Sequence, residues 1–382
     1  MINRILHTEI RRLLQYFSVI VLTGPRQSGK TTLCKEMLKD YAYFNLEDLL
    51  VLQQIQEAPK QFLEKYAPNG IILDEAQRYP DVFSFVQVVA DEHPDYRFVL
   101  TGSSNFALMH KVTQSLAGRA ALFTLLPLSL AELAENIDKE TDTLMFNGGL
   151  PAVWAKQIPA TDVCRSYYNT YIERDVRELL NIKELSKFQT FIRLCAGRVG
   201  SEFNASSLAN EIGVSVFTIN EWLSVLEASY ILFRLPPFFR NIGKRLIKTP
   251  KIYFYDTALV CFLLNIENET QLASHPLRGS IFENLVVLEF IKNRLNVGKE
   301  PNIYFYRDKS QHEVDVIQEF GDSYRAYEIK SARAFHSDFP KNLKYLKSIL
   351  GDTLTLTQVI YDGDTDTDIS ENGVVNFRRI SL

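Results

Sequence analysis

The sequence predicts an α/β fold in which a parallel sheet is followed by a helical region, a three-helix unit and a second α/β unit. Three observations predict this order. Short β-branched apolar runs alternate with helical periodicity in the first third of the 382-residue chain. A glycine-rich segment separates the first such run, residues 17–23, from a helix. Near the other end, charged and apolar residues alternate in two consecutive strands, residues 313–317 and 324–331.

The composition is that of an ordinary folded protein without a strong charge bias. Apolar residues make up 46%, charged residues 23%, and 42 basic against 46 acidic residues give a net charge of −4. The length predicts two to four domains. The four cysteines show no C-x-x-C spacing, which argues against a zinc site or disulfide framework and for a reducing cytoplasm. No run approaches the ~20 apolar residues of a membrane span, so we expect no membrane partner.

The glycine-rich segment fits the phosphate-binding pattern G-x-x-x-x-G-K-[ST] at every fixed position. With the threonine that follows, the expected nucleotide ligands are Gly24, Pro25, Arg26, Gln27, Ser28, Gly29, Lys30, Thr31 and Thr32. Glycines let backbone N–H groups point at an anion, and the positive end of the next helix adds to the field. Lys30 would reach the β- and γ-phosphates as a catalytic residue, and the Thr31 hydroxyl would be a Mg²⁺ ligand.

An apolar run, Ile71–Leu73, ends in two acids, Asp74 and Glu75. Following a phosphate loop, Asp74 would hold the Mg²⁺ hydration shell and Glu75 would polarise the attacking water, which predicts a hydrolase rather than a nucleotide binder. Ser104, in the polar turn after the next strand, could sense the γ-phosphate or simply form a turn. Arg119 is a candidate arginine finger, acting in cis or, in a homo-oligomer, in trans; a structural surface arginine is the alternative.

These motifs resemble those of a large prokaryotic family of AAA-type P-loop ATPases, in which the ATPase module is joined to a C-terminal domain of unknown function similar to restriction endonucleases. Further matching pieces are 100–104, 116–119, 148–151 and 171–175. The resemblance implies ATP, Mg²⁺ and a helical lid over the nucleotide. We expect an ATPase domain over 1–127, the lid over 128–185, a winged-helix domain over 186–250 and a nuclease-like domain over 251–382.

The lid carries Arg174 and Arg177 on one helix face, where they could sense phosphate or form salt bridges with neighbouring acids. Residues 186–245 show the order helix, helix, turn, helix, strand of a winged helix-turn-helix. Its would-be recognition helix, 216–227, has two acids and no base, which is poor for approaching phosphates.

The segment 234–251 is strongly basic. It contains no acid and has Phe238-Phe239 interleaved with six basic residues, namely Arg234, Arg240, Lys244, Arg245, Lys248 and Lys251. Such a segment predicts either contact with a DNA backbone or an interdomain or solvated face.

The C-terminal third carries a second candidate site. Glu283 lies in an apolar helix, Asp315 in a strand, and Glu328 and Lys330 form an E-x-K pattern in the next strand. This pattern resembles the PD-(D/E)xK nuclease fold, although the nominal proline before the aspartate is absent. Asp315 and Glu328 would bind a second divalent cation, Glu283 would complete its shell, and Lys330 would orient or deprotonate a water. A structural ion pair is the alternative.

Two functions follow from these expectations. The first is a cytoplasmic, Mg²⁺-dependent ATPase whose nucleotide state moves a winged-helix and nuclease-like module that acts on DNA. The alternative is an ATP-dependent signalling or scaffold switch of the STAND type, with slow hydrolysis and a catalytically inactive nuclease-like domain.

Overall fold

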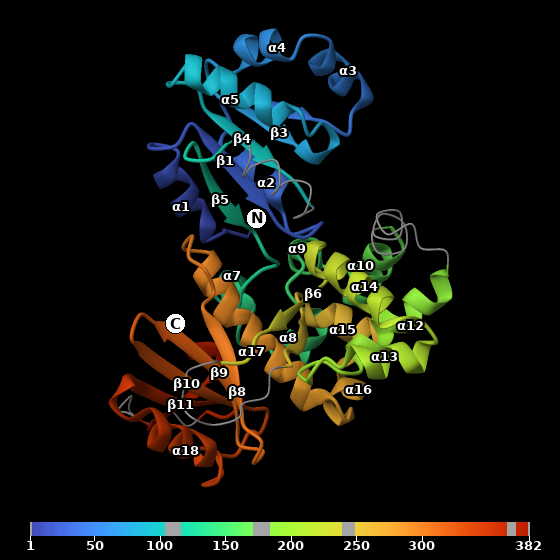
Figure 1. Ribbon diagram of the computed structural model, residues 1–382, viewed down its shortest axis with the longest axis vertical. Helices are drawn as coiled ribbons and strands as arrows, with labels where there is room; N and C mark the ends of the chain where they lie inside the picture. The colour runs from blue at the N-terminus through green and yellow to red at the C-terminus, as the bar shows by residue number, and fades with distance from the viewer. Residues whose placement is uncertain (1, 104–115, 171–183, 239–248, 365–371, 381–382) are drawn as a thin grey trace.

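The computed structural model describes residues 2–103, 116–170, 184–238, 249–364 and 372–380. Figure 1 shows a first sheet with its helices at the top, a group of helices at the lower right, and a second sheet at the lower left. The long helix α17 (Arg278–Leu295) runs between the helical group and the second sheet. The described residues contain no helix long and apolar enough to cross a membrane.

The first sheet has five parallel strands in the order β2-β3-β4-β1-β5. Its strands are β1 (Val19–Thr23), β2 (Ala42–Asn45), β3 (Ile71–Asp74), β4 (Phe98–Thr101) and β5 (Ala120–Thr124). Val19 and Val21 pack on one face and Ile20 and Leu22 on the other, so β1 is apolar throughout. The predicted α/β fold with a parallel sheet is confirmed.

Helices cover both faces of this sheet. Apolar residues of α1 (Leu6–Leu13) and α2 (Lys30–Met37) pack on one face. On the other face lie α3 (Leu49–Glu57), α4 (Pro59–Tyr66) and α5 (Val82–Glu92). Buried on both sides, the sheet holds the carboxyl ends of its strands, and the loops that follow them, in fixed positions.

The middle of the chain is mostly helical. Its helices are α7 (Leu130–Leu133), α8 (Thr141–Asn147), α9 (Pro151–Ala155), α10 (Ala160–Tyr167), α12 (Leu185–Ala196), α13 (Ala205–Ile212), α14 (Val216–Ala228), α15 (Thr257–Leu263) and α16 (Glu269–Ser274). Gly213 ends α13 in the left-handed conformation, and the Ser215 side chain caps α14. After α14, β6 (Leu232–Leu235) pairs with β7 (Lys251–Phe254) antiparallel. The boundary expected after residue 250 therefore falls between two paired strands.

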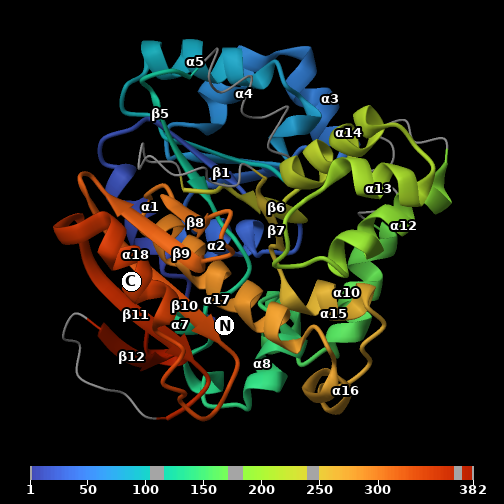
Figure 2. The ribbon, with the colours of Figure 1, turned by 60° about the horizontal axis from the view of Figure 1, so that its bottom comes forward.

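The second sheet has the order β12-β11-β10-β9-β8. Its strands are β8 (Ile303–Arg307), β9 (Glu313–Phe320), β10 (Ser323–Lys330), β11 (Leu354–Tyr361) and β12 (Asn372–Asn376). β10, β11 and β12 are parallel, and β8 and β9 run antiparallel to their neighbours. α17 packs on one face, where the rings of Phe290 and Tyr327 are 4.7 Å apart, and α18 (Lys341–Leu350) packs on the other (Figure 2).

One apolar core joins the middle of the chain to the second sheet. It is continuous from Leu126 to Phe377 and includes Phe191, Leu223 and Phe282. The three regions expected after residue 127 are therefore packed on a common core, whereas the first sheet has cores of its own.

Candidate functional site

The phosphate loop connects β1 to α2, and two of its glycines have conformations that other residues rarely adopt. Gly24 has φ of 141°, and a Cβ there would lie 2.2 Å from the Leu125 carbonyl oxygen. Gly29 caps α2 with φ of 93°. Both fixed glycines of the motif are thus required by the backbone itself. The loop ends at the helix N-terminus, where backbone N–H groups and the helix dipole favour an anion.

Lys30 is buried in this loop. Its Nζ donates to the carbonyl oxygens of Gly24 (2.9 Å) and Pro25 (2.8 Å). Burial lowers the pKa of Lys30 to about 8, although Glu75 and Asp74 partly oppose the shift. The ammonium is therefore held by two weak acceptors in a dry position, and a phosphate anion would be a better partner.

Asp74 ends β3 and meets the phosphate loop directly. Its Oδ2 accepts hydrogen bonds from the Thr31 hydroxyl and the Tyr43 hydroxyl, each 2.7 Å long. Its other oxygen accepts from the Thr101 hydroxyl of β4, the strand between β3 and β1. Hydroxyl and carboxylate oxygens are the ligands that Mg²⁺ prefers, so Thr31 and Asp74 fit the ion that a phosphate loop normally requires.

Glu75 follows in the left-handed conformation, with φ of 56°, and starts the short 3₁₀ helix η1 (Ala76–Arg78). Its Oε2 accepts a hydrogen bond from the Gln77 side-chain amide and one of 3.3 Å from the Ser103 hydroxyl. Gln77 was not anticipated from the sequence. Ser103 belongs to the polar turn that was expected to sense phosphate, whereas Ser104 lies outside the described residues.

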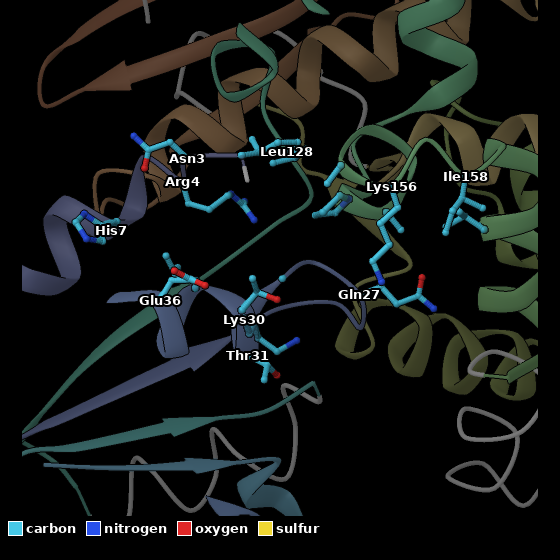
Figure 3. A pocket seen from close by; sticks show the side chains of 18 of the residues that line it. Asn3, Arg4, His7, Gln27, Lys30, Thr31, Glu36, Leu128, Lys156 and Ile158 are labelled. Atoms are coloured by element: carbon cyan, nitrogen blue, oxygen red, sulfur yellow. The ribbon is translucent and has the colours of Figure 1, made fainter. Parts of the chain in front are cut away.

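A cavity of about 810 Å³ adjoins the loop, within the range of small-molecule sites. The phosphate loop contributes Gln27, Gly29, Lys30, Thr31 and Thr32 to its wall. Figure 3 shows side chains from two further places: Asn3, Arg4 and His7 from the N-terminal segment, and Lys156 and Ile158 from the region between α9 and α10. The Lys156 side chain points toward Gln27. The sequence did not indicate these lining residues, because no local pattern reveals which distant segments meet.

Arg4 holds the phosphate loop in place through hydrogen bonds of its guanidinium group. Its guanidinium donates to the carbonyl oxygens of Ser28 and Leu126, each at 2.7 Å, and to the Glu132 carboxylate at 3.0 Å. Only 7% of Arg4 is exposed. In the loop itself, Arg26 pairs with Glu47 at 3.6 Å. The N-terminal segment is therefore part of the site.

Arg119 is not in the site of its own chain. Its backbone carbonyl accepts from Val19 N, at the start of β1, while the phosphate loop follows Thr23 at the end. Four residue steps of strand, about 13 Å, separate the two edges. The exposed Arg119 guanidinium pairs with Asp91 at 2.5 Å. The direction of the strands therefore argues against the cis alternative for Arg119, and a role in trans stays a prediction. Arg174 and Arg177 lie outside the described residues.

The residues of the second candidate site lie close together, and one further residue, Lys251, joins them. Glu283 from α17, Asp315 from β9, and Glu328 and Lys330 from β10 converge, and Lys330 Nζ lies 2.7 Å from Glu328 Oε1. Asp315 Oδ2 accepts from Ile329 N at 2.7 Å. Burial raises the pKa of Asp315 and of Glu328, and the neighbouring carboxylates add to the effect at Asp315. Lys251 enters from β7.

Two of the six basic residues of the expected DNA-binding segment are described, and both pair with acids. Arg234 makes a two-pronged ion pair with Glu227, both bonds 2.7 Å long. Lys251 is 2% exposed, and Phe238 is buried in the core beneath α18. Lys251 and Phe238 therefore fit the alternative of an interdomain face, whereas the Arg234 side chain stays 43% exposed beside Glu227. The other four basic residues, Arg240, Lys244, Arg245 and Lys248, lie outside the described residues.

Family models match three consecutive segments of the chain, and the first of them contains the phosphate loop. Residues 16–134 match the AAA domain family. These residues are similar to AAA domains, and they contain the phosphate loop. Residues 138–270 match a domain of unknown function (DUF8612), and residues 278–380 match another (DUF4143).

Curated relatives span most of the chain. An uncharacterized protein of Mycobacterium tuberculosis is 29% identical over 374 residues, covering 96% of this chain and 81% of that protein. One of Methanocaldococcus jannaschii is 23% identical over 346 residues, covering 82% and 75%. These alignments extend over the AAA domain and the regions that follow it.

Solved structures show weaker likeness. The Walker-type ATPase of Pyrococcus abyssi has a TM-score of 0.45 at 14% identity, covering 68% of this chain and 94% of that one. A STAND protein with a tetratricopeptide repeat sensor, from Pyrococcus horikoshii, has a TM-score of 0.27 at 12% identity, covering 78% and 48%.

Proposed function

We propose that the chain is a Mg²⁺-dependent ATPase whose nucleotide state is transmitted to its helical and C-terminal parts. The observation that carries the proposal is the 2.7 Å hydrogen bond between Thr31 and Asp74. This bond joins the phosphate loop to the acidic end of β3, so the phosphate-binding groups lie beside the carboxylates of Asp74 and Glu75. The AAA domain match supports ATP as the nucleotide.

Each residue has a defined task in this proposal. Lys30 would leave its two carbonyl acceptors and bind the β- and γ-phosphates. Thr31 and Asp74 would hold Mg²⁺, which neutralises charge on those phosphates when bound. Glu75 would accept a proton from the attacking water, and its hydrogen bonds from Gln77 and Ser103 orient the carboxylate. Asn3, His7 and Ile158 line the cavity away from the loop, where the base would lie.

Buried polar contacts support transmission from this site. Glu132, which binds Arg4, also closes a capping box with Ser129 at the start of α7. The next residue, Leu130, donates its N–H to Glu289 of α17 at 2.8 Å. The phosphate loop is thus linked through Arg4 and α7 to the helix that carries Glu283.

A second link leaves β1. The hydroxyl groups of Thr23 and Tyr230 are 2.9 Å apart. Thr23 immediately precedes the phosphate loop, and Tyr230 lies between α14 and β6 with φ of 55°. A conformational change in the phosphate loop would therefore reach both α17 and the three-helix unit, which consists of α12, α13 and α14.

The test is phosphate release from ATP by the full chain. Lys30→Ala should abolish turnover, and Glu75→Gln should reduce it at least about 100-fold while retaining binding of a fluorescent ATP analogue. Glu64→Gln, a half-exposed residue that pairs with Lys60 far from the loop, is the matched control and should hydrolyse normally. Wild-type turnover by Glu75→Gln would reject the assignment.

A specific observation favours the switch alternative. The ammonium of Lys251 lies among the carboxylates of the C-terminal cluster, 3.0 Å from Glu283 and 2.5 Å from Glu313. A restriction-endonuclease-like site needs those carboxylates for a cation. We therefore infer a C-terminal domain that binds a partner while ATP sets its state. Metal-dependent DNA cleavage by the wild type, lost in Asp315→Ala with Lys330→Ala, would instead favour the nuclease.

DNA as the partner is proposed on the four basic residues between β6 and β7 together with the winged-helix order of the preceding elements. A gel-shift titration of the Lys244→Glu, Arg245→Glu double variant tests it. Binding with an unchanged salt dependence would remove DNA from the proposal.

A further inference from the structure

Lys251 is the first residue of β7, and it is buried against the second sheet. Its Nζ lies 3.0 Å from Glu283 Oε1, 2.5 Å from Glu313 Oε1 and 3.9 Å from Asp315 Oδ1. Only 2% of the residue is exposed. Burial alone would lower the pKa of Lys251, because it disfavours the charged form. The surrounding acids outweigh burial and hold the pKa well above its ordinary value. The side chain is therefore a charged ammonium surrounded by carboxylates.

The carboxylates themselves are unusually dry. Asp315 and Glu328 are 7% and 4% exposed. Glu328 Oε1 accepts from Lys330, but its buried Oε2 has no hydrogen-bond partner among the described residues. Tyr253, two residues after Lys251 on the same face of β7, donates to Glu283 Oε1 at 2.6 Å. An unpaired buried carboxylate oxygen is costly, and it marks this cluster as incomplete.

A divalent cation does not fit the cluster as it stands. Such an ion needs several oxygens about 2.0–2.6 Å from one point. Within the described part of the chain, the acidic and histidine side chains whose ligand atoms all lie within 4.8 Å of one another are Glu64, Glu92 and His93, on α4 and at the end of α5. The C-terminal carboxylates are not gathered in this way, because the ammonium of Lys251 lies between them.

The lysine and the carboxylates come from different parts of the chain. β7 is hydrogen-bonded to β6, and Ile252 O accepts from Gly200 N, so Lys251 is fixed to the three-helix unit. Glu313 and Asp315 belong to β9, and Glu283 belongs to α17. β7 is also held to α17, because the buried Asn284 side chain accepts from Phe254 N and donates to Phe254 O. The residues that follow β6 are bonded to β8, where Phe238 N donates to Phe305 O at 2.7 Å. Lys251 is therefore kept among the three carboxylates.

We propose that Lys251 is the resident cation of this acidic cluster and takes the place that a divalent metal ion would otherwise occupy. Lys251 contacts Glu283, Glu313 and Asp315 but not Glu328, whose Oε2 has no partner among the described residues, whereas a divalent ion would attract all of these carboxylates. The contact is thus an internal block on a metal site. This inference goes beyond the proposed ATPase and does not depend on it.

The test is Mn²⁺ binding to the nucleotide-free full chain, measured by titration calorimetry and by the shift in thermal unfolding temperature. Lys251→Met should bind Mn²⁺ at least about tenfold more tightly than the wild type, a change within the range reported for neighbours of metal ligands. Adding Asp315→Asn to that variant should remove the gain, because a ligand is lost. ATP hydrolysis by each variant reports whether the first domain is intact.

A milder variant covers the case in which Lys251→Met fails to fold. Glu313→Gln removes the 2.5 Å partner of Lys251 and leaves Glu283, Asp315 and Glu328 in place. It should also bind Mn²⁺ more tightly than the wild type. Equal Mn²⁺ affinity in the wild type and both variants, or no binding by either variant, would overturn the proposal. Failure of ATP hydrolysis with a normal Mn²⁺ response would instead reject only the proposed ATPase.

Discussion

Binding of ATP should take up part of a proton near pH 8, because burial lowers the pKa of Lys30 to about 8. The buried ammonium donates to two carbonyl oxygens. Triphosphate oxygens beside Lys30 favour its charged form and raise its pKa, so a lysine that is neutral in the free protein becomes protonated on binding. The γ-phosphate loses its last proton near pH 6, so it is about 90% ionised at pH 7 and almost fully ionised at pH 8 and 9.

The magnitude of the proton uptake follows from the fraction of neutral Lys30 in the nucleotide-free protein. With a pKa of about 8, uptake should be ~0.1 proton at pH 7, ~0.5 at pH 8 and ~0.9 at pH 9. Because only the protonated lysine binds phosphate well, affinity should fall about tenfold from pH 7 to pH 9. The sign is that of a lowered pKa: the favourable state is present below pH 8 and is lost above it.

Calorimetric titration with a non-hydrolysable ATP analogue measures this uptake. The binding heat is recorded at each pH in two buffers of different ionisation enthalpy, and their difference gives the protons exchanged. Lys30→Arg is the matched control, since arginine stays protonated at every pH used and should show no uptake. Heats independent of the buffer at pH 8, or equal uptake by Lys30→Arg, would refute the assignment of a neutral fraction to Lys30.

Two further outcomes are expected. Arg119→Ala should leave turnover unchanged in dilute, monomeric protein, because the residue lies at the edge of the sheet opposite the phosphate loop; a loss that appears only at concentrations where the chain associates would establish a role in trans. Glu289→Gln should lower the free energy of unfolding by about 3 kcal/mol in urea titrations, since its partner Lys292 stays buried. In this variant, ATP should no longer slow hydrogen exchange in α17, whereas retained slowing would show that Glu289 does not transmit the nucleotide state.

The sequence was most informative where function depends on neighbouring residues. The phosphate loop is a contiguous pattern, and its glycines are dictated by local backbone geometry, as the position of Gly24 against Leu125 shows. Asp74 was predicted for the same reason, since it ends an apolar strand. Their meeting through Thr31 follows from strand order, which a family resemblance implied but the spacing alone did not.

Residues that act through distant contacts were missed or misassigned. Arg4 and Gln77 belong to no pattern, and their roles appear only when the loop and η1 are in place. The basic run that ends at Lys251 left a DNA contact and an interdomain or solvated face open, and strand pairing buries this residue among acids. A run of like charges in the sequence indicates a solvated face only where the strand that carries it is not packed between other elements.

The common core beneath α17 also determines which parts of the chain can exist alone. The first 125 residues have apolar clusters of their own, so the AAA domain could be produced as a separate fragment. The segments on either side of residue 270 cannot be divided in this way, because Phe191 and Phe282 belong to one cluster. Cutting there would expose a wide apolar surface on both pieces and favour aggregation. The first domain could therefore be exchanged between genes as a unit, whereas the segments before and after residue 270 must stay together.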